Sequence, residues 1–93
     1  MFPNIDGQAL RRGALAAIQS RAMPRDPPLQ MWGGRGSGET CPVCGQACDP
    51  AEAELELEFA PLENNQAPRE FHLHLACFEV WDLVRTSAPA TEA

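Results

Sequence analysis

The sequence predicts a small α+β fold with an N-terminal helix, a flexible Gly/Pro linker, a β-hairpin and a C-terminal helix. Three observations predict it: the chain has only 93 residues, residues 54–59 alternate between Glu and apolar side chains, and residues 74–85 carry apolar side chains with a helical period. A core this small rarely stabilises a domain alone, so a further source of stability is expected, and the four Cys are the candidates.

Residues 8–22 are predicted to form a helix, because apolar side chains recur near one of its faces. These side chains are Leu10, Ala14, Leu15 and Ile18. Gly13 weakens the helix by about 1 kcal/mol relative to Ala. The proline-rich run at residues 23–28 ends it, because Pro lacks the amide donor and restricts the preceding residue. Residues 32–38 (WGGRGSG) are predicted to be a flexible connector; a phosphate-binding loop is disfavoured because the chain has no Lys.

Residues 54–59 (ELELEF) are predicted to form a half-buried strand, since one side carries apolar residues and the other carries Glu54, Glu56 and Glu58. Residues 61–68 contain Pro and an Asn-Asn pair, which favour a loop. Residues 69–73 then form a second strand and complete a hairpin. The predicted core combines both strands with the helix that follows. Its members are Leu55, Leu57, Phe59, Phe71, Leu73, Phe78 and Trp81.

Charge divides the chain unequally. Residues 1–38 hold five Arg and two Asp, a net charge of +3, whereas residues 39–93 hold two Arg and eleven acidic residues, a net charge of −9. We therefore predict a basic N-terminal segment at 1–38, a separate module at 39–85 and a disordered tail at 86–93. The acidic strand is interpreted either as an ordinary solvated face or as a docking face for a basic partner. That partner is another protein or the basic N-terminal helix, either of the same chain or of a second copy, which would give a homodimer.

The composition excludes several classes of function. Without Lys, the chain has neither a P-loop lysine nor a Schiff-base nucleophile. No apolar run approaches the roughly 20 residues that span a bilayer, and residues 1–20 do not resemble a secretory signal. We therefore expect a cytoplasmic protein with reduced thiols, with an organellar transit peptide as the alternative. The use of Ala, Arg, Gly and Pro without Lys suggests a bacterial source.

Four residues carry a metal-binding pattern. Cys41 and Cys44 flank a Pro-Val pair and precede Gly45, which can adopt the left-handed conformation that such a turn needs. His74 and Cys77 are three residues apart at the start of the predicted helix, so their side chains share one face. Three thiolates and one imidazole can complete a tetrahedron around Zn²⁺. With no open position, such a site is structural.

A zinc knuckle, a hairpin and a helix whose first turn supplies two ligands form a treble-clef arrangement. The pattern C-x2-C, a gap of about thirty residues and H-x-x-C-F resembles the poly(ADP-ribose) polymerase-type zinc finger, and it is similar to small uncharacterised bacterial zinc-finger proteins. The resemblance covers residues 33–81. It implies a zinc finger, and in the eukaryotic family such a finger grips DNA with basic and stacking residues. This module is acidic instead.

Two residues offer alternatives within the ligand set. Cys48 is interpreted as a small buried side chain beneath the knuckle, as a replacement ligand, or as a redox partner of Cys44 that would eject zinc. His72 lies two residues before His74 and is the alternative imidazole ligand. A thioredoxin-like role for the Cys-x-x-Cys motif is disfavoured, because the chain lacks the βαβ pattern of those enzymes.

The sequence therefore predicts a non-enzymatic zinc-binding protein that acts as a protein-interaction module. The first alternative is a nucleic-acid-binding finger, although the net charge of −6 opposes phosphate binding. Its candidate contacts are Arg11, Arg12, Arg21, Arg25 and Arg35. The second alternative is a thiol redox sensor that releases zinc on oxidation.

Overall fold

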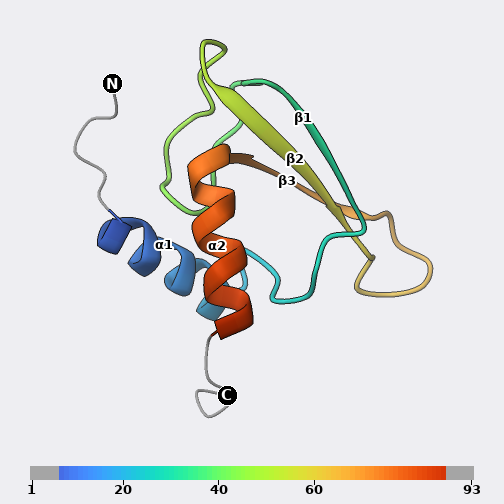
Figure 1. The fold of residues 1–93 in the computed structure, drawn as a ribbon. Helices are drawn as coiled ribbons and strands as arrows, with labels where there is room; N and C mark the ends of the chain where they lie inside the picture. The colour runs from blue at the N-terminus through green and yellow to red at the C-terminus, as the bar shows by residue number, and fades with distance from the viewer. Residues whose placement is uncertain (1–6, 88–93) are drawn as a thin grey trace.

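The computed structural model describes residues 7–87, which form a three-stranded antiparallel sheet and two helices (Figure 1). The elements follow the order α1 (Gly7–Gln19), β1 (Gln30–Arg35), β2 (Ala53–Phe59), β3 (Arg69–His74) and α2 (Leu75–Ser87). The strands lie in the order β1-β2-β3. The predicted α+β class, N-terminal helix, hairpin and C-terminal helix are confirmed. Within these residues, no helix is long and apolar enough to cross a membrane.

The hairpin of β2 and β3 has the register that its apolar residues favour. Leu55 faces Leu73 and Leu57 faces Phe71 across the two strands. Leu57 and Leu73 are completely buried, as is Phe59 at the end of β2. Since paired residues point to the same side of a sheet, this side packs toward the helices and the opposite side carries the glutamates.

The predicted connector at residues 32–38 is the main difference in the fold. Residues up to Arg35 belong to β1, which pairs antiparallel with β2 from Gln30 to Arg35. All six residues of β1 are exposed, so the strand lacks the alternating burial that would reveal it in the sequence. Its conformation is set by pairing with β2 rather than by its own pattern. The prediction of a flexible linker was therefore wrong for Trp32 to Arg35.

Helix α2 is longer than predicted and begins one residue later. Thr86 and Ser87, predicted as the start of the tail, lie in the last turn of α2. The Thr86 hydroxyl donates to the backbone carbonyls of Asp82 and Leu83 at 3.1 and 3.0 Å, which ties this turn to the preceding one. The rest of the predicted tail, residues 88–93, lies outside the described residues.

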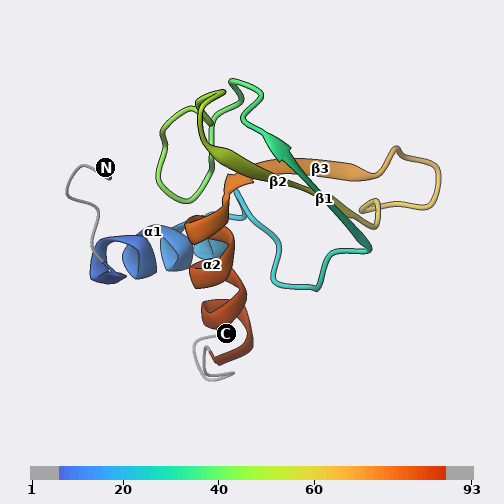
Figure 2. The same cartoon turned by 45° about the horizontal axis from the view of Figure 1, so that its top comes forward.

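Both helices lie on the same side of the sheet, and α1 packs against α2 (Figure 2). Trp81 of α2 is completely buried, its ring meets Phe59 edge to face at 5.8 Å, and its indole N–H donates to the Pro24 carbonyl at 3.1 Å. Gly13 allows close approach, since a Cβ there would lie 2.2 Å from the Val43 carbonyl oxygen. One core therefore includes side chains from α1, the sheet, α2 and the segment between β1 and β2. Its buried members are Ala14, Ala17, Ile18, Met23, Cys41, Val43, Cys48, Leu57, Phe59, Leu73, Cys77, Trp81 and Val84.

Helix α1 ends at Gln19, three residues earlier than the sequence predicts. Arg21 has a φ of 67°, a left-handed conformation that an α-helix cannot continue through. The Arg21 amide donates to the Ile18 carbonyl at 3.1 Å, and the Met23 amide donates to the Ala17 carbonyl at 3.0 Å. These bonds close the end of the helix and turn Met23 back into the core, where it is 1% exposed.

Candidate metal centre

The segment between β1 and β2 folds into the predicted knuckle. Thr40 and Ala47 form an isolated antiparallel bridge, and the Cys41 amide donates to the Gln46 carbonyl at 2.9 Å. The Gly45 amide donates to the Cys41 carbonyl at 2.8 Å, and Gly45 has a φ of 79°. This tight turn places the side chains of Cys41 and Cys44 on the same side of the loop, as the spacing predicts.

The other two residues come from the junction of β3 and α2. His74 is the last residue of β3 and pairs with Glu54 across the hairpin, whereas Cys77 lies in the first turn of α2. The prediction that both residues share one helical face was therefore wrong. His74 is held by strand pairing, and the turn from strand into helix brings Cys77 beside it.

The structure brings Cys41, Cys44, His74 and Cys77 together in one cluster. Their four possible ligand atoms all lie within 4.8 Å of one another. The Nδ1 atom of His74 is 3.4 Å from the sulfur of Cys44 and 3.9 Å from that of Cys77. Zn–S and Zn–N bond lengths of about 2.3 and 2.0 Å give tetrahedral S–N separations of about 3.5 Å. The donor set and its spacing therefore fit Zn²⁺.

The ligand atoms of the cluster are shielded to different degrees. Cys41 and Cys77 are 0% and 3% exposed, whereas Cys44 and His74 are half-buried. Thiolates and imidazole are the soft and borderline donors that select zinc rather than calcium or magnesium. Four protein side chains complete a tetrahedron, which is the composition of a closed structural zinc site.

The second nitrogen of His74 is also positioned. Its Nε2 lies 3.1 Å from the Ala47 carbonyl and 3.2 Å from a carboxylate oxygen of Glu52. An N–H at Nε2 donates to these acceptors and leaves the lone pair of Nδ1 directed at the three sulfurs. Metal-binding histidines are commonly held in this way, because the outer partner sets both the tautomer and the ring orientation. Glu52 could not be assigned this role from the sequence, because it is close to His74 only through the fold.

The thiols of the cluster have unequal acidity. The hydrogen bond from the Cys77 thiol, with backbone amides nearby, lowers the pKa of Cys41 to about 4 against the opposing effect of burial. The same contact, together with burial, raises the pKa of Cys77. Burial raises the pKa of Cys44. A divalent cation must therefore displace protons from Cys44 and Cys77, so metal affinity increases with pH.

Cys48 lies outside this cluster. It is 0% exposed and belongs to the hydrophobic core beneath the knuckle. Burial, followed by the negative charge of Glu54, raises the pKa of the Cys48 thiol to about 12. A buried, protonated thiol is a poor nucleophile and a poor ligand. The structure thus supports the interpretation of Cys48 as a small core residue.

His72, the alternative imidazole, points to a different partner. Its Nδ1 bonds to the carboxylate of Glu54, which is 6% exposed and also accepts the Ser37 amide at 2.6 Å. Burial opposes ionisation of Glu54, but these hydrogen bonds outweigh it and lower the pKa of Glu54. For His72, burial lowers the pKa, but the hydrogen bond to Glu54 and the charges of nearby carboxylates outweigh this effect. The pKa of His72 is therefore raised overall. Glu54, expected on a solvated strand face, is instead a buried link between the sheet and the segment after β1.

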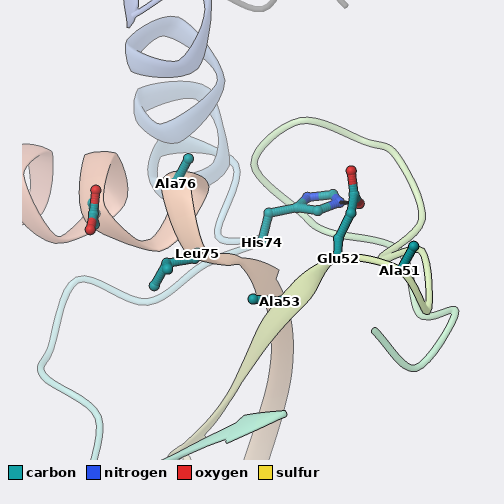
Figure 3. A pocket seen from close by; sticks show the side chains of 7 residues that line it. Ala51, Glu52, Ala53, His74, Leu75 and Ala76 are labelled. Carbon is teal, nitrogen blue, oxygen red and sulfur yellow. Dashed lines mark ion pairs between the residues drawn. The ribbon is translucent and has the colours of Figure 1, made fainter. Parts of the chain in front are cut away.

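A hollow of about 390 Å³ opens beside His74 (Figure 3). Most of its lining is apolar, and the Glu52 carboxylate lies at the Nε2 end of the His74 imidazole. None of the three sulfurs of the cluster belongs to residues that line it. Of the four cluster residues, the hollow therefore reaches only His74. Its lining residues are Ala51, Glu52, Ala53, His74, Leu75, Ala76 and Glu79.

We expect Glu52→Gln to weaken zinc binding about tenfold, because the neutral amide holds the Nε2 proton of His74 less strongly. The Ala47 carbonyl remains as a second acceptor for this proton. The loss of zinc affinity should therefore lie at the lower end of the range found when the outer partner of a metal-binding histidine is removed. A competition titration against a chelator of known affinity measures it. Glu63→Gln removes the same charge from the exposed β2–β3 loop and serves as the control. Equal affinities for the two variants would show that Glu52 does not position the ligand.

Comparisons with known proteins give no relative. No family model, no curated protein and no solved structure matches this chain. The resemblance to treble-clef fingers therefore rests on the four ligand residues and their spacing. What the structure itself supports is a Cys₃His cluster consistent with a zinc site, within a small α+β fold.

Proposed function

We propose that this chain is a non-enzymatic protein-interaction module whose fold is held together by one structural zinc ion with treble-clef-like coordination. The observation that carries the proposal is the convergence of Cys41, Cys44, His74 and Cys77 within 4.8 Å. Zinc in such a set contributes an apparent 10–16 kcal/mol or so to folding near neutral pH. That is comparable with the whole stability of an ordinary domain.

The position of the cluster supports a structural role. It joins the knuckle to the junction of β3 and α2, two parts of the chain that are far apart in the sequence. Because four protein ligands fill a tetrahedron, no position is left for an activated water, which a zinc hydrolase requires. The ion would therefore crosslink the fold, and the exposed surfaces would act on other molecules.

The two alternatives have less support. A zinc-releasing redox sensor needs a reactive thiol next to the ligands, whereas the Cys48 side chain is fully buried in the core. Nucleic-acid binding needs a basic surface, and the glutamates of β2 and β3 give one face of the sheet the opposite charge. A protein partner fits this surface better than a phosphate backbone does.

Native mass spectrometry and cobalt substitution together test the metal site. We expect one zinc ion per chain, which a chelator removes. With Co²⁺ in its place, we expect the visible absorption of a tetrahedral thiolate site, and no change when azide is added. An azide-dependent spectrum would reveal an open position and contradict the structural role. A chain that binds no metal would overturn the proposal altogether.

A further inference from the structure

The outer edge of β1 is a free, exposed edge of the sheet. All six residues from Gln30 to Arg35 are exposed, and β1 pairs with β2 on one side only. The Gly36 amide donates to the Glu52 carbonyl, so by alternation the even-numbered residues of β1 bond to β2. The amides and carbonyls of Met31, Gly33 and Arg35 therefore face away from the sheet.

This edge has few of the devices that usually protect an edge strand. It contains no Pro and no Lys, and its single charge, Arg35, is at one end. In the middle, Gly33 and Gly34 leave the backbone uncovered by side chains. An open edge of this kind can accept an extended segment as an additional strand through main-chain hydrogen bonds.

The sheet face next to this edge carries an excess of negative charge. Glu58 lies directly opposite Glu70, and the carboxylates of Glu56 and Glu70 lie within 4.8 Å of each other beside His72. Within residues 7–87, none of these three glutamates forms a salt bridge. Like charges directly opposite destabilise a sheet. A local arrangement that costs stability is typical of a binding surface.

Trp32 identifies the kind of cation that suits this face. It pairs with Glu56, so both side chains lie on the same side of the sheet, and it is 44% exposed. An exposed indole beside carboxylates suits the guanidinium of Arg or the ammonium of Lys, which stack on the ring and pair with the acid. A divalent metal would make no use of Trp32. It would also have to share His72 with Glu54.

We propose that β1 and the adjoining acidic face bind an extended, Arg- or Lys-rich segment of a partner protein as a fourth strand. Its alternate basic side chains lie over Trp32 and point toward Glu56 and Glu58 of β2, and Glu70 of β3 adds to the negative charge of the face. A second copy fits poorly. Pairing of two β1 strands would place two acidic faces side by side, and the basic α1 is a helix whose Ala14, Ala17 and Ile18 are buried in its own core. The inference rests on the proposed interaction role and names its partner class.

The test uses the zinc-loaded chain and a synthetic, end-capped heptapeptide of alternating Arg and Val. Titration followed by amide chemical shifts should move the signals of Met31, Gly33 and Arg35 most. The combined variant Glu56→Gln, Glu58→Gln, Glu70→Gln should weaken the peptide Kd at least tenfold, and Trp32→Ala about fivefold. Glu63→Gln, in the exposed β2–β3 loop, should leave it within twofold. A peptide N-methylated on the amides that face β1 keeps its charge and should bind at least tenfold more weakly.

Several outcomes would overturn the proposal. Equal affinity for the N-methylated peptide would exclude strand addition, and an unchanged Kd in the combined variant would exclude the acidic face. Zinc or Mn²⁺ binding at Glu56, Glu70 and His72 that blocks the peptide would assign the face to a metal. Self-association that involves β1 would assign it to a second copy. The cobalt spectrum separates the two proposals, because an intact tetrahedral site without peptide binding refutes only the docking surface.

Discussion

Removal of the metal is expected to unfold this protein. The ion would join Cys41 and Cys44 of the knuckle to His74 at the end of β3 and Cys77 in the first turn of α2. Its apparent contribution of about 10–16 kcal/mol exceeds the net stability that so small a hydrophobic core provides. Without it, the like-charged face of the sheet and the half-buried knuckle favour the unfolded chain. Addition of a chelator should abolish the cooperative thermal transition seen by circular dichroism. The fluorescence of Trp81, buried in the folded state, should shift to that of an exposed indole.

Single ligand variants sharpen this test. Cys41→Ser and His74→Ala should each lose the bound metal under native mass spectrometry and behave like the chelated chain. Cys48→Ala is the matched control, because Cys48 is as buried as Cys41 but lies outside the ligand cluster. It should retain one zinc ion and a cooperative transition. A chelated wild-type chain that keeps its melting transition would refute the structural role of the metal, and loss of zinc in Cys48→Ala would place Cys48 among the ligands.

The metal cluster could be predicted because it depends on short-range spacing. Two pairs of ligand residues, each separated by three positions, identify the site whether His74 ends a strand or begins a helix. The position of His74 within β3 could not be predicted in the same way. It follows from the pairing of Glu54 with His74, and a β2–β3 loop of nine residues does not determine a register.

Interactions between distant segments explain which features of the fold could not be predicted from the sequence. The alternation of β2 predicts glutamates on a solvated face, and this holds for Glu56 and Glu58, which are partly exposed. Glu54 differs because Ser37 and His72, 17 and 18 positions away, supply donors to its carboxylate. Similarly, β1 has no apolar alternation of its own. It forms a strand because it pairs with the free edge of β2, and this pairing cannot be predicted from the residues of the segment itself.

Gly36 shows how closely the glycine-rich segment after β1 approaches the knuckle. A Cβ at this position would lie 2.0 Å from the Asp49 carbonyl oxygen and 2.4 Å from that of Cys48. Both obstacles are backbone atoms, and they belong to the chain that leads from the knuckle into β2. The glycines at 33, 34 and 36, which suggest a flexible connector in the sequence, therefore differ in role: only at 36 does the backbone leave no room for a side chain.

Gly36→Ala should accordingly lower the free energy of unfolding by about 3 kcal/mol, because the knuckle must move away from the sheet to admit the methyl group. For a domain of this size, that corresponds to a fall in the melting temperature of roughly 12 °C or more, measured by differential scanning calorimetry on the zinc-loaded chain. Gly34→Ala, two residues earlier in β1, is the matched control, since nothing lies within 4 Å of its added Cβ. It should leave the midpoint unchanged or raise it slightly, as expected when glycine is replaced in a strand. Equal melting temperatures for the two variants would mean that the knuckle is free to shift against the sheet. In that case the metal, rather than the packing at Gly36, would bring the ligands of the knuckle to those at the junction of β3 and α2.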